Sequence, residues 1–179
     1  MVIEKVTGQP LATVLRHDLL GPAGLDRMWL QVDEKPTAPL TVAANPDAKI
    51  VDPAGGYLPS RAAASTGHGA AGMAADAPTL ARWGYLLFGG RIIDPALVAT
   101  MTNGDPLSEY GYGFGTMIGG DNSRPVVGHG GDYIGYSSLL GCWPDSQTVV
   151  VVLLPAQGMS MDATNWSFVL HETLSAVGG

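Results

Sequence analysis

The sequence predicts an α+β fold. A mainly helical and loop part (residues 1–105) precedes an antiparallel sheet with a C-terminal helix (residues 106–179). Apolar residues recur at helical spacing in the first part and alternate with a period of two after residue 110. The connections between the later strands are too short for parallel crossovers, so these strands should pair antiparallel. Helices followed by a meander indicate one α+β domain over residues 1–179.

Four helices are expected in the first part. They cover residues 2–7, 10–20, 76–88 and 94–103; Asp76 caps the third helix and Asp94 precedes Pro95 at the start of the fourth. The first helix is too short to be stable alone and is interpreted as the tail of a longer one. Prolines break every periodicity in residues 33–59, which we expect to be irregular. The faces expected to be buried comprise Leu11, Val14, Leu15 and Leu19; Leu80, Trp83 and Leu87; and Leu97, Val98 and Met101.

Four strands are expected in the second part, at residues 112–118, 124–130, 134–143 and 147–154, with turns at 119–122 and 144–146. A helix should follow at 162–177. The continuous valine run of the last strand does not alternate, which indicates burial on both faces. That strand has one neighbour in the sequence, so its other edge should recruit a partner. We expect a homodimer, a swapped assembly or a complementing N-terminal chain.

Composition excludes several functions. The net charge of −7 and the pI near 4.8 argue against nucleic acid binding, which requires a basic face. The longest apolar run, residues 149–156, is too short for a membrane span. The single cysteine, Cys142, cannot form an internal disulfide. The histidines at 17, 68, 129 and 171 lack the spacing of metal ligands, so no metal site is expected.

The run from Val127 to Asp132 is the strongest functional signal, because it places His129 among three glycines at the end of an apolar strand. Glycines allow a ligand to approach the backbone closely. The alternative is a histidine at a strand end between turn glycines, with Gly130 and Gly131 forming an ordinary bulge. Ser65, Thr66 and His68 form a second polar group, but no third residue is placed to orient the histidine. We interpret it as a loop that lines a cleft.

An ordered set of short motifs covers nearly the whole chain. It comprises Ile3–Pro10, Leu20–Leu25, Ala70–Met73, Leu80–Trp83, Gly89–Pro95, Tyr110–Phe114, Gly128–Gly131 and Gly135–Ser138. Together these motifs resemble the C-terminal portion of the class C β-lactamase and DD-peptidase superfamily of serine hydrolases. The resemblance implies a partial fold of this type, in which an antiparallel sheet of about four strands is flanked by helices. The N-terminal strands and the nucleophile helix would be absent.

The resemblance also implies acyl transfer on an amide or ester carbonyl by a carboxypeptidase, esterase or β-lactamase-like enzyme that needs no cofactor. His129 would begin the third motif (H-x-G), Gly130 and Gly131 would leave room for substrate, and the backbone N–H of Asp132 would be an oxyanion-hole donor. The Asp132 side chain can instead satisfy His129 or a turn N–H. Tyr110 and Tyr112 are interpreted as packing residues.

The first two motifs of the family, S-x-x-K and Y-x-N (or S-x-N), have no counterpart here. None of the ten serines has lysine three residues later, and no tyrosine or serine is followed two residues later by asparagine. The chain alone is therefore predicted to be inactive. The alternative is a non-catalytic remnant, or a binding or assembly module that dimerises through its open sheet edge. Family analogy suggests a periplasmic or secreted location and leaves the cytoplasm open.

Overall fold

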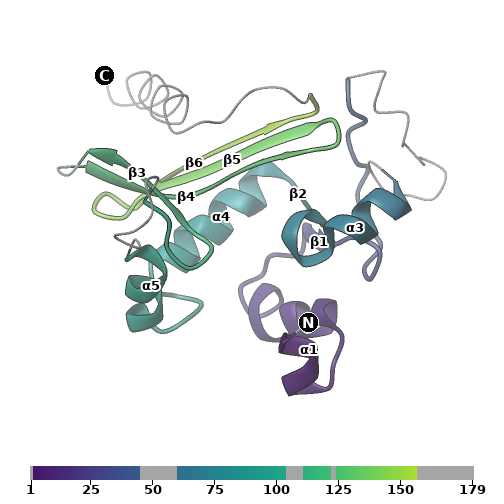
Figure 1. Cartoon of the computed structure of the whole chain (residues 1–179), viewed down its shortest axis with the longest axis horizontal. Coiled ribbons are helices and arrows are strands. Elements are labelled where there is room, and N and C mark those ends of the chain that lie inside the picture. The colour runs from purple at the N-terminus through teal and green to yellow at the C-terminus, as the bar shows by residue number, and fades with distance from the viewer. Residues whose placement is uncertain (1, 45–59, 104–110, 122–123, 157–179) are drawn as a thin grey trace.

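The computed structural model describes residues 2–44, 60–103, 111–121 and 124–156 (Figure 1). Its helical elements are α1 (Val2–Thr7), α2 (Leu11–Val14), the π-helix η1 (Leu15–Leu20), α3 (Arg61–Ala71), α4 (Ala77–Phe88) and α5 (Pro95–Thr102). Its strands are β1 (Met28–Leu30), β2 (Met73–Ala75), β3 (Met117–Asp121), β4 (Arg124–Tyr133), β5 (Tyr136–Trp143) and β6 (Thr148–Leu154).

The main sheet is an antiparallel meander with the strand order β3-β4-β5-β6, which confirms the predicted α+β class and the pairing of consecutive strands. Helix α4 lies along one face of this sheet (Figure 1) and contacts β5 and β6. A second, two-stranded sheet pairs β1 with β2, beside the N-terminal helices. That pair was not expected, because three-residue strands carry too little alternation to be recognised.

Gly84 sets the contact between α4 and the sheet. A methyl group at this buried glycine would lie 3.0 Å from Leu140 Cδ1 and 3.1 Å from Val149 Cγ1. Glycine in a helix interior costs about 1 kcal/mol relative to alanine, and here it allows the helix to approach two strands closely. On the opposite face, a separate core cluster contains Val126, Leu139 and Trp143. The sheet therefore has apolar side chains on both faces.

The turn between β4 and β5 consists of Ile134 and Gly135, with Tyr133 and Tyr136 as the closing pair. Both turn residues have positive φ, 36° and 89°, as a two-residue type I′ hairpin requires. A β-branched residue with positive φ is strained. The tyrosines anchor the turn: the Tyr133 hydroxyl donates to the Ala63 carbonyl at 2.8 Å, and the Tyr136 hydroxyl donates to the Thr41 carbonyl at 2.9 Å.

The first predicted strand begins later than expected. Residues 112–118 were expected to be extended, but β3 starts at Met117 and continues through the glycines that were assigned to a turn. The backbone N–H of Gly113 donates to the Thr116 carbonyl at 2.8 Å, and Gly115 has φ 68°, so the chain turns there. Tyr112 forms only an isolated bridge with Met117. Ile134, expected to begin the third strand (residues 134–143), lies in the hairpin turn.

The predicted helices at 76–88 and 94–103 are confirmed. Asp76 accepts a hydrogen bond from the Thr79 N–H at 2.9 Å and Asp94 accepts one from the Ala96 N–H at 2.8 Å, as N-caps do. Leu97 was expected to face inward, but it is 56% exposed, while Val98 is buried. The expected helix at 10–20 changes from α to π geometry at Leu15. The helix expected at 162–177 lies outside the described residues.

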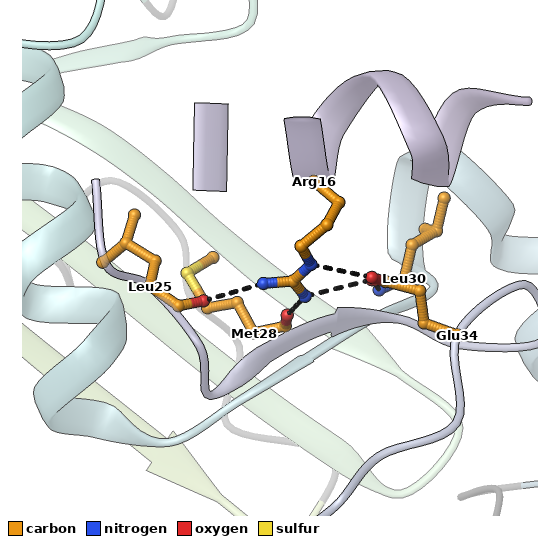
Figure 2. A network of polar contacts seen from close by, with 5 residues as sticks. All are labelled: Arg16, Leu25, Met28, Leu30 and Glu34. Atoms are coloured by element: carbon orange, nitrogen blue, oxygen red, sulfur yellow. Dashed lines mark hydrogen bonds and ion pairs between the residues drawn. The ribbon is translucent and has the colours of Figure 1, made fainter. Parts of the chain in front are cut away.

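Arg16 connects the N-terminal helical region to β1 (Figure 2). Its guanidinium donates to both carboxylate oxygens of Glu34, at 2.8 and 3.2 Å, and to the carbonyls of Leu25, at 3.3 Å, and Met28. Glu34 also accepts from the Leu30 N–H at 3.0 Å. A bidentate pair that is less than one-third exposed and also satisfies backbone groups holds this region in one arrangement.

Strand β6 pairs with β5, and no other strand pairs with it among the residues that the structure describes. Its seven residues are all half-buried. The sequence predicted burial on both faces of this strand, whereas its residues are only partly buried. Its position at the edge of the described sheet agrees with the sequence interpretation.

Candidate active site

His129 lies on the face of the sheet that α4 covers. It pairs directly with Leu140, and opposite residues of antiparallel strands project their side chains to the same face. Leu140 packs against Gly84 of α4, whereas Tyr133, further along β4, bonds to α3. Between these two covered points His129 is exposed and Gly131 is half-buried. This face of the sheet is therefore solvent-exposed at the position of His129.

Both ring nitrogens of His129 have partners. Nε2 lies 2.9 Å from the Tyr112 hydroxyl, and Nδ1 contacts the carbonyl of Gly130. The two rings meet edge to face, with centroids 5.7 Å apart and an interplanar angle of 85°. Sequence reasoning assigned Tyr112 to packing and missed this contact. The tyrosine is 37% exposed and presents its hydroxyl to the histidine.

Gly131 has a structural reason to be glycine. Its partner in β5 is Ser138, and a methyl group on Gly131 would lie 2.7 Å from the Ser138 hydroxyl oxygen. The space left by the missing side chain is thus partly filled from the same chain. Gly130 pairs with Leu139, in the strand as predicted. The register is continuous from Val127 to Tyr133, so the two glycines lie in a regular ladder and not in a bulge.

Asp132 projects to the face opposite His129, because successive strand residues alternate. It pairs with Ser137, whose buried hydroxyl lies 3.3 Å from Asp132 Oδ1 and 2.9 Å from the Ala156 carbonyl oxygen. The side chain thus contacts a neighbouring hydroxyl, which is neither of the two partners, His129 or a turn N–H, that the alternative named. The role assigned to Asp132 by the resemblance uses its backbone N–H and does not depend on this contact.

The second polar group, at residues 65–68, lies in a helix and not in a loop as predicted. Ser65 and Thr66 donate their hydroxyls to the Ala62 carbonyl at 2.8 and 2.9 Å, as they do inside helices. The helix was missed because Gly67 and Gly69 are poor helix formers. His68 has φ 35°, where the helix kinks, and its Nε2 lies 3.4 Å from Asp33 Oδ2. Asp33 is the third group that the sequence did not reveal, but the Ser65 hydroxyl is directed to its own helix.

Nearby titratable groups are shifted by burial. Desolvation raises the pKa of Tyr136 in the hairpin, and it raises the pKa of the Cys142 thiol to about 11.

Among the described residues, no three histidine, cysteine or carboxylate side chains gather as metal ligands. None of the helices in the described ranges has the length and apolar character needed to cross a bilayer.

The family described as Beta-lactamase matches the chain over residues 1–173. Among curated proteins, no sequence matches the chain.

Solved structures of the same fold match most or all of the chain. The D-amino acid amidase of Ochrobactrum anthropi SV3 superposes with a TM-score of 0.75 at 21% identity, covering 100% of this chain and 55% of the amidase. A D-stereospecific amidohydrolase from Streptomyces sp. gives 0.63 at 26% identity, over 87% and 47% of the two chains. The octameric penicillin-binding protein homologue from Pyrococcus abyssi gives 0.71 at 19%, over 99% and 40%. This chain therefore spans about half the length of the structures that it matches.

Proposed function

We propose, from the premise that this chain belongs to the β-lactamase family of serine hydrolases, that it supplies the sheet side of an active site for acyl transfer on amides or esters. The nucleophile and its activating lysine would lie on polypeptide outside the 179 residues. The observation that carries this proposal is that the family match covers residues 1–173, while none of the ten serines precedes a lysine by three residues.

The reaction that we assign to the assembled site is acyl-enzyme hydrolysis. A serine oxygen attacks the substrate carbonyl carbon, and the amine or alcohol leaves with a proton. Water then releases the acid and restores the serine. The backbone N–H of Asp132 is one of two donors to the oxyanion. His129 is the polar side chain that begins the third motif and lines the site. Gly130 and Gly131 present no side chain on this part of β4, and the Ser138 hydroxyl takes up part of the space at Gly131.

Two features support this placement of the site. His129 is exposed on the α4 face and already engaged in a polar pair with Tyr112. Two of the similar structures are a D-amino acid amidase and a D-stereospecific amidohydrolase. We therefore favour an amide substrate over an ester. The carboxypeptidase and esterase assignments stay predictions.

The test begins with the coding DNA upstream, where S-x-x-K and Y-x-N should be encoded in frame or in a neighbouring frame. The joined polypeptide should hydrolyse chromogenic amides or esters, and His129→Ala should lower kcat/KM by about 10- to 1000-fold. His17→Ala is the matched control, because His17 is exposed and its ring contacts the carboxylate of the adjacent Asp18. The 179-residue chain alone should show no turnover. Turnover by that chain alone would refute the proposal.

A second candidate function is assembly without catalysis, through the open edge of β6. The observation that favours it is that β6 pairs with β5 alone among the described strands, and its residues are only half-buried. Unpaired edges of this kind recruit a partner strand. Sedimentation equilibrium should then show a dimer, a swapped assembly or association with a complementing N-terminal chain. A soluble monomer at high concentration would exclude this function.

A further inference from the structure

The contact between Tyr112 and His129 arises from strand pairing and not from a local motif. Tyr112 bridges Met117, and Met117 pairs with Gly128, so the backbone of Tyr112 is two strand spacings from the residue before His129. The intervening turn closes through the Gly113–Thr116 hydrogen bond, and the Phe114 N–H donates to the Met101 carbonyl at 3.1 Å. The loop that carries Tyr112 is thus held against both β3 and α5.

The partners of the His129 ring determine where its proton lies. A carbonyl oxygen can only accept, so the contact with the Gly130 carbonyl places a proton on Nδ1. In the neutral ring, Nε2 then carries a lone pair, and the Tyr112 hydroxyl donates to it at 2.9 Å. This assignment follows from the network of partners. It leaves the Tyr112 oxygen with free acceptor capacity on an exposed face.

We infer that Tyr112 is a positioning residue that holds His129 as a single Nδ1–H tautomer with a fixed ring orientation. The inference rests on the proposed function, in which His129 begins the third motif. It assigns the polar role of that motif to the Tyr112–His129 pair and not to His129 alone. The pair would present the phenol oxygen as an acceptor, while the imidazole nitrogens are both occupied. An isolated exposed histidine would instead exchange between tautomers and ring orientations, and ordered side chains of this kind support precise sites.

The test is nitrogen NMR of the imidazole rings in the 15N-labelled 179-residue chain, in mildly alkaline solution. The His129 signals are assigned by their loss in His129→Asn. In the unsubstituted chain Nδ1 should appear as a protonated nitrogen and Nε2 as an unprotonated one. In Tyr112→Phe both shifts should move toward the averaged values of an exchanging ring. Tyr85→Phe is the matched control, because Tyr85 is similarly exposed and its ring lies against Arg91.

Two outcomes would overturn the inference. One is an averaged His129 ring in the unsubstituted chain, which needs no variant to observe. The other is a Tyr112→Phe chain that folds normally and keeps the single tautomer. Because the readout is the protonation pattern and not turnover, the proposed function can fail while this inference stands, and the reverse also holds.

Discussion

Gly131 and Ser138 lie directly opposite each other on β4 and β5, and a methyl group on the glycine would approach the serine hydroxyl oxygen to 2.7 Å. A side chain at this glycine, two residues after His129, would thus meet a neighbouring hydroxyl. Packing and substrate access can be separated experimentally, because the obstructing atom belongs to one small side chain.

Gly131→Ala should destabilise the protein by about 1–3 kcal/mol, the usual cost of overpacking. In a Ser138→Ala background the same change should cost less than about 0.5 kcal/mol, because the obstructing oxygen is gone. Urea unfolding of the four chains gives the coupling energy. Gly119→Ala is the matched control, since a methyl group there meets nothing within 4 Å. Equal costs in both backgrounds would show that Ser138 is not the obstacle.

Lysine should not be able to replace the Arg16 guanidinium without a loss of stability. Arg16→Lys keeps the charge but cannot bond both oxygens of Glu34 and two carbonyls at once, so we expect a loss of about 1–3 kcal/mol in unfolding free energy. Arg27→Lys provides the comparison, because its ion pair with Asp76 is more exposed and should contribute less than about 1 kcal/mol. A larger loss at Arg27 than at Arg16 would contradict this interpretation.

The hairpin between β4 and β5 should gain stability from a better turn residue. Ile134 has φ 36°, and Asn-Gly is the preferred pair for a type I′ turn. Ile134→Asn should therefore raise the unfolding free energy by about 0.5–1 kcal/mol, since a left-handed conformation costs roughly 1–2 kcal/mol for an ordinary residue. Ile134→Val keeps the branched Cβ and should bring no gain. Destabilisation by asparagine would mean that burial of the isoleucine outweighs its strain.

The Cys142 thiol should be unreactive in the folded chain. Burial raises its pKa to about 11 from an ordinary value of 9, so the folded state binds a proton that the unfolded state releases. Below pH 9 both states are protonated and the thiol contributes no pH dependence. Between pH 9 and about 11, stability should fall as pH rises. Cys142→Ala should remove that part of the decline, and thiol labelling at pH 8 should require unfolding. Rapid labelling of the folded protein would contradict the assignment.

The sequence predicted those elements whose signals are local. The capped helices beginning after Asp76 and Asp94 and the order of the four strands agree with the structure, because caps and alternation lie within a few residues. Helix α3 was not predicted because two glycines interrupt it. The β1–β2 pair was not predicted because Met28 and Ala75 meet only through tertiary pairing.

The same distinction applies to the candidate site. His129 was selected from its neighbouring glycines, and the structure places it at an exposed position of β4. Tyr112 could not be selected, because its contact with the histidine depends on a bridge to Met117 that no spacing rule predicts. A tyrosine between glycines before a strand is the only signal that the sequence offers, and the same pattern also occurs in packing residues.

Gly84 couples the position of α4 to that of the strand against which it packs. A bulkier residue there would require a shift of α4 or of the side chain of Leu140, the cross-strand neighbour of His129. In a saturation mutagenesis screen, this position should therefore score among the functionally intolerant ones, although Gly84 is a buried residue of α4 and not of β4. Intolerance at Gly84 would mean that the distance between α4 and the sheet affects activity through Leu140 and His129.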